Sequence, residues 1–138
     1  MNTASSPEVL TVLVAARNEA QSLPALHPRI AAVLKRLDGV QGRVLYVDDG
    51  STDGTWEIMQ GLARKDASVS LLRLSRNFGK ELALTAGLDQ VETGAVLILD
   101  ADGQDPPELI PQFVAHWRQG YDDVHGTRIQ REGEGWLK

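Results

Sequence analysis

The sequence predicts an α/β protein built on a Rossmann-like, open and mostly parallel sheet with helices on both faces. Four short, nearly continuous apolar runs have the length of strands: residues 9–16, 43–47, 69–74 and 95–99. Continuous apolar runs are typical of parallel strands that are covered on both faces. Segments with helical spacing separate the runs. Such alternation favours right-handed βαβ units and a parallel sheet.

Helices are predicted between and after these strands, because apolar residues recur there every three or four positions. They are expected at residues 23–37, around 58–62, at 81–91 and at 109–117. Gly39 suits the end of the first helix. Pro106 and Pro107 end the strand before them and suit the first turn of the last helix. One more short strand is predicted at residues 121–124.

Length and composition exclude several classes of protein. The 138 residues, 42% of them hydrophobic, allow one domain with a real core. A net charge of −5 without a basic run argues against nucleic acid as a partner. The absence of cysteine excludes disulfides, thiolate catalysis and cysteine–zinc sites. No apolar run approaches the roughly 20 residues that span a bilayer, and no signal peptide is recognisable. We therefore expect this chain itself to be soluble and cytoplasmic.

Sequence motifs of three common enzyme classes are also missing. No Gly-x-Gly-x-x-Gly segment follows a strand, and there is no Walker lysine motif, so dinucleotide-binding and P-loop chemistry are disfavoured. A serine hydrolase would need a Gly-x-Ser-x-Gly segment, which the chain lacks.

The strongest candidate site follows the apolar run that ends at Leu99. Asp100 and Asp102 stand where this strand gives way to a loop. Two carboxylates held this close repel each other unless a cation lies between them. Hard oxygen ligands suit Mg²⁺ or Mn²⁺, and Gln104 offers a further neutral oxygen. The carboxyl end of a strand is also where open α/β sheets bind ligands. A solvated acidic turn is the alternative interpretation.

Polar groups follow the first two strands as well. Arg17-Asn18-Glu19 closes the first strand, and Asp48-Asp49-Gly50-Ser51 closes the second. A carboxylate at this position is able to accept hydrogen bonds from a ribose hydroxyl or a base N–H. The same residue types also cap helices, so Ser51, Thr52 or Asp53 is expected as the N-cap of the following helix.

Two cationic clusters complete the candidate residues. Arg76, Asn77 and Lys80 follow the third strand, and Arg128 and Arg131 lie near the end of the chain. Arginines so placed bind a diphosphate or a phosphate acceptor in a bidentate manner. A solvated surface charge is the alternative for each of them.

Four segments that occur in order at strand ends carry a family resemblance: VAARNE (14–19), VDDGSTDGT (47–55), SRNFGKE (75–81) and DADGQDPPE (100–108). Together they resemble the family-2 inverting glycosyltransferases, which have the A-type nucleotide-sugar fold. Within this family the chain is most similar to the dolichol- or polyprenyl-phosphate sugar transferases. The resemblance covers nearly the whole chain. It departs from the family pattern at Ala16-Arg17, where Pro and Tyr-like residues are common.

The resemblance implies roles for the matching residues. The metal, Mg²⁺ or Mn²⁺, would be bound by Asp100, Asp102 and Gln104. Asp102, Arg128 and Arg131 are implied as the catalytic residues, the arginines contacting phosphates within the GTRIQR segment (126–131). The nucleotide-binding residues would be Ala16, Arg17, Asn18, Glu19, Asp48, Asp49, Ser51, Asn77, Lys80, Asp100, Ala101 and Asp102.

The implied reaction moves a sugar from a UDP- or GDP-linked donor to a polyprenyl or dolichyl phosphate, with inversion. One alternative is a family-2 enzyme that elongates a polysaccharide or O-antigen at a hydroxyl acceptor. Another is a nucleotidyltransferase, although this would need a glycine-rich phosphate loop after the first strand. A third is a module that binds nucleotide and metal but has no catalytic activity by itself.

The family also implies more chain than the 138 residues contain. We expect residues 1–138 to form a nucleotide-sugar-binding domain whose acceptor-facing and membrane part is missing, so the fold would be truncated at its C-terminal side. The full-length protein is expected at the cytoplasmic side of the membrane. An incomplete domain that exposes apolar surface is also a candidate for homo-oligomerisation.

Overall fold

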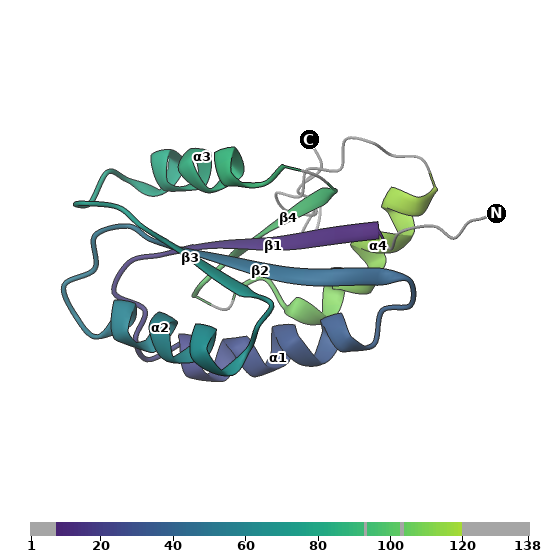
Figure 1. Cartoon of the computed structure of the whole chain (residues 1–138), viewed down its shortest axis with the longest axis horizontal. Helices are drawn as coiled ribbons and strands as arrows, with labels where there is room; N and C mark the ends of the chain where they lie inside the picture. The colour runs from purple at the N-terminus through teal and green to yellow at the C-terminus, as the bar shows by residue number, and fades with distance from the viewer. Residues whose placement is uncertain (1–7, 93, 103, 120–138) are drawn as a thin grey trace.

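The computed structural model describes residues 8–92, 94–102 and 104–119. In this part of the chain a four-stranded sheet has the order β3-β2-β1-β4, and every neighbouring pair is parallel (Figure 1). The strands are β1 (Glu8–Ala16), β2 (Val40–Asp48), β3 (Val69–Arg73) and β4 (Ala95–Asp100). The predicted parallel α/β architecture is confirmed.

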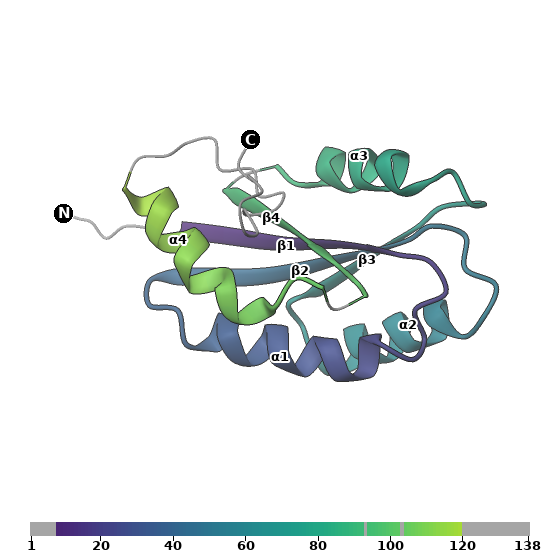
Figure 2. The same cartoon turned by 180° about the vertical axis from the view of Figure 1, so that it is seen from behind.

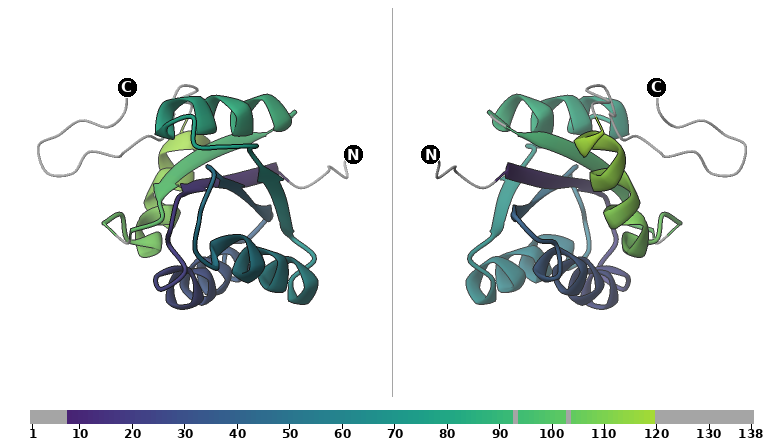
Figure 3. Two further views of the ribbon diagram at one scale, coloured as in Figure 1. Left: turned by 90° about the vertical axis from the view of Figure 1, so that its left-hand side faces the viewer. Right: turned by 90° about the vertical axis from the view of Figure 1, so that its right-hand side faces the viewer.

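Helices cover both faces of this sheet, also as predicted. They are α1 (Leu23–Lys35), α2 (Thr55–Lys65), α3 (Lys80–Gln90), the short 3-10 helix η1 (Pro107–Leu109) and α4 (Ile110–Arg118). End views show α3 alone above the sheet and α1 and α2 below it (Figure 3). Helix α4 packs against α1 and η1, and the reverse view shows that it runs obliquely past the sheet (Figure 2). None of the described helices has the length and apolar character needed to cross a bilayer.

The position of β1 in the sheet explains why its sequence is apolar at nearly every position. Successive side chains of a strand point to opposite faces. Leu10, Val12 and Val14 belong to the core cluster shared with α1, α2 and α4, whereas Leu13 belongs to the cluster under α3. All four are fully buried. Burial on both faces therefore favours apolar residues along this central strand. The exceptions are Glu8, which is exposed at the start of the strand, and the buried Thr11.

The register brings the strand ends to one edge of the sheet. Ala16 pairs with Asp48, Asp48 pairs with Arg73, and Ala15 pairs with Asp100. The hydrogen bonding between β1 and β2 continues one residue beyond the end of β2, since the Asp49 N–H donates to the Ala16 carbonyl at 2.9 Å. The segments selected from the sequence thus leave the sheet side by side at its carboxyl edge.

His27 is held in the core by hydrogen bonds. Its Nδ1 lies 2.7 Å from the Tyr46 hydroxyl and its Nε2 lies 3.0 Å from Asp66 Oδ2. Burial raises the pKa of the Tyr46 hydroxyl, and the hydrogen bond from the Ser68 hydroxyl lowers the pKa of Asp66. This buried chain joins α1 and β2 to the turn that precedes β3.

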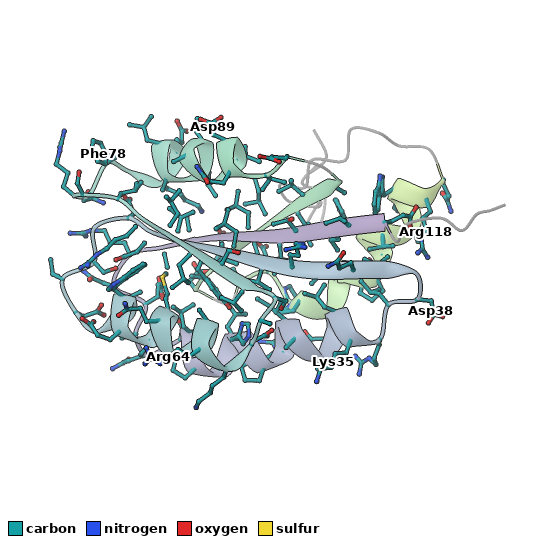
Figure 4. The ribbon with its side chains drawn as sticks, in the orientation of Figure 1. Lys35, Asp38, Arg64, Phe78, Asp89 and Arg118 are labelled. Atoms are coloured by element: carbon teal, nitrogen blue, oxygen red, sulfur yellow. The ribbon has the colours of Figure 1, made fainter. Side chains whose placement is uncertain are left out.

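The boundaries of several elements differ from the prediction. Helix α1 ends at Lys35, two residues early, although Leu37 still packs against the core. Strand β2 begins at Val40 rather than residue 43, because β1 pairs with it from Glu8 onward. Near the start of both strands, the Arg118 guanidinium donates to Glu8 Oε1 and to the Asp38 carbonyl, which ties the end of α4 to the sheet (Figure 4). The strand predicted at 121–124 lies outside the described residues.

Helix α3 packs closely on the sheet at Gly87, and this contact leads to a testable prediction. A Cβ atom at Gly87 would stand 2.5 Å from Leu13 Cδ1 and 3.0 Å from Val47 Cγ2, both in fully buried side chains. We expect Gly87→Ala to lower the free energy of unfolding by about 1–2 kcal/mol, since overpacking outweighs the gain in helix propensity. Chemical denaturation monitored by circular dichroism measures the change.

The control is Gly61→Ala on α2, where an added Cβ meets no atom within 4 Å. This variant should be about 0.5–1 kcal/mol more stable, because alanine favours a helix interior over glycine. Equal stabilisation by both substitutions would show that α3 does not pack as closely as described.

Candidate functional site

A pocket of about 170 Å³ opens at the carboxyl edge between β1 and β4. It is lined by Ala15, Ala16, Arg17, Glu19, Asp49, Lys80, Asp100, Ala101 and Asp102. A second, wider hollow adjoins it on the β2–β3 side and shares Arg17 with it; this hollow is lined by Arg17, Gly50, Ser51, Thr52, Arg73, Leu74, Ser75, Arg76 and Asn77. Most residues selected from the sequence therefore line one continuous edge, which carries both carboxylates and cations.

The predicted residues that line neither hollow fall into two groups. Asn18 and Asp48 lie at the same edge but are engaged within the protein, and Gln104 follows the Asp102 loop as an exposed residue. Arg128 and Arg131 lie outside the described residues.

Asn18 joins the loop after β1 to the loop after β2. It has a positive φ of 58°, a left-handed conformation that asparagine tolerates better than most residues. Its side-chain oxygen accepts the Thr52 N–H at 2.8 Å, while its own N–H donates to Ser51 Oγ at 2.9 Å. The next residue, Glu19, donates its N–H to Thr55 Oγ1 at 2.9 Å. The side chain of Asn18 thus stabilises a loop contact.

Asp49 joins the loop after β2 to the loop after β3. One carboxylate oxygen accepts the Phe78 N–H at 2.8 Å; the other accepts the Gly79 N–H at 3.1 Å and the Asn77 side-chain amide at 3.0 Å. The residue is only 4% exposed. A carboxylate that is buried this deeply needs such donors. Asp49 therefore holds the main chain that leads into α3, where Phe78 marks the turn (Figure 4).

Gly50 lets the same two loops approach each other. Its φ is +73°, and a Cβ there would lie 2.3 Å from the Asn77 nitrogen and 2.4 Å from the Arg76 carbonyl carbon. Both the backbone conformation and the contact exclude a side chain at this position. From the sequence, Gly50 is selected only as part of the segment that closes the second strand, because local patterns do not reveal a close approach to a distant loop.

Asp48 is the most deeply buried carboxylate of the site. It is fully buried, and its Oδ1 accepts the Ser51 N–H at 3.1 Å. Its Oδ2 accepts no hydrogen bond from any described residue, and the nearest cation is Arg73, whose Nε lies 3.7 Å away. The Arg73 guanidinium stacks over Trp56, with Cζ 5.0 Å from the ring centroid. Asp48 Oδ2 is thus an acceptor with capacity left for a donor.

The Asp100 loop carries the predicted metal ligands. The half-buried Asp100 pairs with Lys80, whose Nζ lies 2.5 Å from Oδ1. The exposed Asp102 accepts the Gln104 N–H at 3.0 Å on Oδ1. Within the described residues no group of three His, Cys, Asp or Glu side chains is arranged around a metal position. Two carboxylates fit Mg²⁺ or Mn²⁺ when substrate phosphates and water supply the remaining ligands.

Capping of α2 differs from the prediction. The N-cap residue is Gly54, which has no side chain, rather than Ser51, Thr52 or Asp53. Asp53 Oδ1 instead accepts both the N–H and the hydroxyl of the buried Thr55, at 2.9 and 2.5 Å. The hydroxyl of Thr55 is the largest cause of the lowered pKa of Asp53. Thr55 was not selected from the sequence, because its contacts span distant loops.

Comparison with known proteins identifies the family. Residues 11–138 match the model of Glycosyl transferase family 2, and the chain belongs to this family. It is 42% identical over 129 residues to a protein of Synechocystis sp. named uncharacterized glycosyltransferase sll0501, covering 94% of this chain and 40% of the relative. It is 41% identical over 131 residues to the undecaprenyl-phosphate 4-deoxy-4-formamido-L-arabinose transferase of Pseudomonas savastanoi pv. phaseolicola, covering 94% of this chain and 38% of the relative.

Solved structures agree on the fold. The chain superposes on TarS residues 1–349 from S. aureus with a TM-score of 0.68 and 23% identity, covering 88% of this chain and 38% of that one. It also superposes on the mannosyltransferase PcManGT from Pyrobaculum calidifontis in complex with GDP-Man and Mn²⁺. The TM-score is 0.61 and the identity 28%, and the match covers 80% of this chain and 32% of that one. The fold is that of the A-type glycosyltransferases. The chain spans about two fifths of the length of the curated relatives it matches.

The role of Asp49 is testable by Asp49→Asn. The amide nitrogen of asparagine cannot accept a hydrogen bond, so at least one donor of the loop loses its partner, at a cost of about 1–3 kcal/mol. We expect amide hydrogen exchange at Phe78 and Gly79 to accelerate by about tenfold or more. The matched control is Asp89→Asn, an exposed carboxylate on α3 (Figure 4), which should leave exchange at these amides unchanged. Unchanged exchange in Asp49→Asn would refute the anchoring role.

Proposed function

We propose that this chain is the donor-binding part of an inverting glycosyltransferase that transfers a sugar from a UDP- or GDP-linked donor to a polyprenyl phosphate. The observation that carries the proposal is the convergence of Asp49, Lys80, Asp100 and Asp102 on one pocket in a family-2 chain. The relative from Pseudomonas is named as an undecaprenyl-phosphate transferase, which supports a polyprenyl phosphate as the acceptor.

The nucleoside is proposed to occupy the hollow on the β2–β3 side. Arg17, Ser51 and Asn77 line it, and cationic side chains at its rim attract an anionic ligand. Asp48 is fully buried and lines neither hollow, so its proposed contribution to nucleotide binding is indirect. It accepts the Ser51 N–H and thereby positions Ser51, which lines the hollow.

The diphosphate is proposed to lie in the adjoining pocket near Lys80, with Asp100, Asp102 and Gln104 holding Mg²⁺ or Mn²⁺. A PcManGT structure contains GDP-Man and Mn²⁺, which supports a divalent ion at the equivalent edge here. Such an ion would neutralise negative charge on the departing diphosphate. Lys80 supplies a second cation to the phosphates from its position at the start of α3. The remaining nucleotide contacts are assigned to Ala16, Glu19 and Ala101, which line this pocket.

The acceptor is proposed to be a phosphate, contacted by Arg128 and Arg131. A phosphate is already anionic near neutral pH, so positioning and electrostatics carry most of the rate and a strong general base is less necessary. Because a polyprenyl chain lies in a membrane, the complete enzyme is proposed to work at the membrane surface. Since the chain spans about two fifths of its relatives, a donor-binding unit without turnover of its own is the second candidate.

Calorimetric titration of UDP and GDP into the chain, first with Mn²⁺ and then with EDTA, tests the proposal. One nucleotide should bind in the presence of Mn²⁺ and lose most of its affinity in EDTA, because Asp100 and Asp102 would hold an ion that neutralises the charge of the diphosphate. Failure of both nucleotides to bind a folded chain would contradict the proposed donor site. Addition of polyprenyl phosphate and the matching nucleotide sugar then separates an enzyme from a binding unit.

The variant Asp102→Ala tests the assignment of the metal ligands. We expect it to weaken Mn²⁺-dependent nucleotide binding by at least tenfold. The free energy of unfolding should stay within about 0.5 kcal/mol of that of the unchanged chain, because Asp102 is exposed. Glu57→Ala, an exposed carboxylate on α2, serves as the control. Nucleotide binding that survives Asp102→Ala and still requires Mn²⁺ would show that the ligands are assigned wrongly.

A further inference from the structure

Lys80 and Asp100 form an ion pair across the pocket. The ammonium lies 2.5 Å from Asp100 Oδ1 and joins α3 to the end of β4. Both residues line the same pocket as Asp102. The carboxylate assigned to the metal is therefore already neutralised by a cation that belongs to the protein.

The position of Lys80 follows from the anchoring of the preceding loop. Asp49 accepts the N–H groups of Phe78 and Gly79, and Gly79 has a φ of +102° that turns the chain into α3. Lys80 is the first residue of that helix. Its main chain is thus fixed, while its long side chain is free to reorient within the pocket.

The ion pair is also open to exchange. The side chain of Lys80 is 59% exposed and that of Asp100 is 21% exposed. Ion pairs with this much contact with solvent contribute little to stability, so a stronger partner displaces either member. A divalent cation is a stronger partner for Asp100, and a diphosphate is a stronger partner for Lys80.

We propose that Lys80 is an exchangeable counter-ion of Asp100, which makes divalent metal binding depend on the nucleoside diphosphate. This inference rests on the proposed function, because it takes Asp100 and Asp102 as the metal ligands. A metal ion that approaches Asp100 alone is opposed by the ammonium next to that carboxylate. The diphosphate draws the ammonium to its own oxygens and leaves Asp100 to the ion.

Two consequences distinguish this role from ordinary phosphate binding. The chain discriminates against free metal ions and favours the metal–diphosphate complex. By reciprocity, the nucleotide raises the affinity for metal by the same factor as the metal raises the affinity for nucleotide. Removal of Lys80 should therefore strengthen metal binding without nucleotide, whereas loss of a simple phosphate ligand would leave it unchanged.

The experiment measures Mn²⁺ binding to the 138-residue chain by the electron paramagnetic resonance of free Mn²⁺, without nucleotide and then with UDP or GDP. Lys80→Met keeps the length of the side chain and removes its charge. We expect its affinity for Mn²⁺ without nucleotide to rise by about 1.5- to fivefold, the range of an exposed ion pair. The factor by which nucleotide strengthens Mn²⁺ binding should fall correspondingly. Lys80→Arg should behave like the unchanged chain.

Arg17→Gln is the matched control, because Arg17 lines the same pocket but forms no ion pair with Asp100 in the described part of the chain. An equal rise in Mn²⁺ affinity in Arg17→Gln would attribute the effect to general charge and overturn the proposal. If the unchanged chain binds Mn²⁺ in the presence of nucleotide, and Lys80→Met has the same Mn²⁺ affinity with and without nucleotide, only the counter-ion role is wrong. If no variant binds Mn²⁺ even with nucleotide, the metal site of the proposed function is wrong as well.

Discussion

The carboxylate of Asp49 is the interaction on which the site depends. Asp49 directly follows β2, it is almost fully buried, and its carboxylate accepts three N–H donors from the loop before α3. A buried carboxylate without these donors would be costly, and a loop without this acceptor would leave N–H groups unpaired. Each partner therefore stabilises the other. The position of Lys80 opposite Asp100 follows from this contact, since Lys80 directly follows the anchored segment.

The rest of the edge is ordered by the same kind of contact between loops. Asn18 and Thr55 join the loop after β1 to the loop after β2, and Gly50 allows the loop after β3 to pack directly on the latter. The parallel register brings all these loops to one end of the sheet. Ligand groups are thus held on rigid strand ends and supported by a second layer of hydrogen bonds, the arrangement that precise binding requires.

Much of this arrangement could be predicted from the sequence. The apolar runs and the helical spacing predict the parallel sheet, because burial on both faces leaves a clear pattern in a strand such as β1. The strand ends predict where polar residues meet, so Asp49, Lys80, Asp100 and Asp102 were all selected. The different structural roles of these residues could not be predicted. Asp49 and Asp100 look alike in the sequence, yet Asp49 anchors a loop through backbone N–H groups and Asp100 forms an ion pair with Lys80. The deciding contacts join residues 20 to 36 positions apart, and no local pattern encodes them. The Gly54 cap of α2 has the same cause, because Asp53 and Thr55 are engaged with the loop after β1.

The central claim is that a donor nucleotide binds at the preformed carboxyl edge. Amide chemical-shift mapping of the isotope-labelled chain, titrated with UDP or GDP in the presence of Mg²⁺, tests it most directly. The account predicts that the shifted amides cluster at residues 16–19, 48–52, 76–80 and 100–104, with those of α1 and α4 unchanged. Shifts centred on the opposite end of the sheet, around Arg43 and Val91, would contradict it.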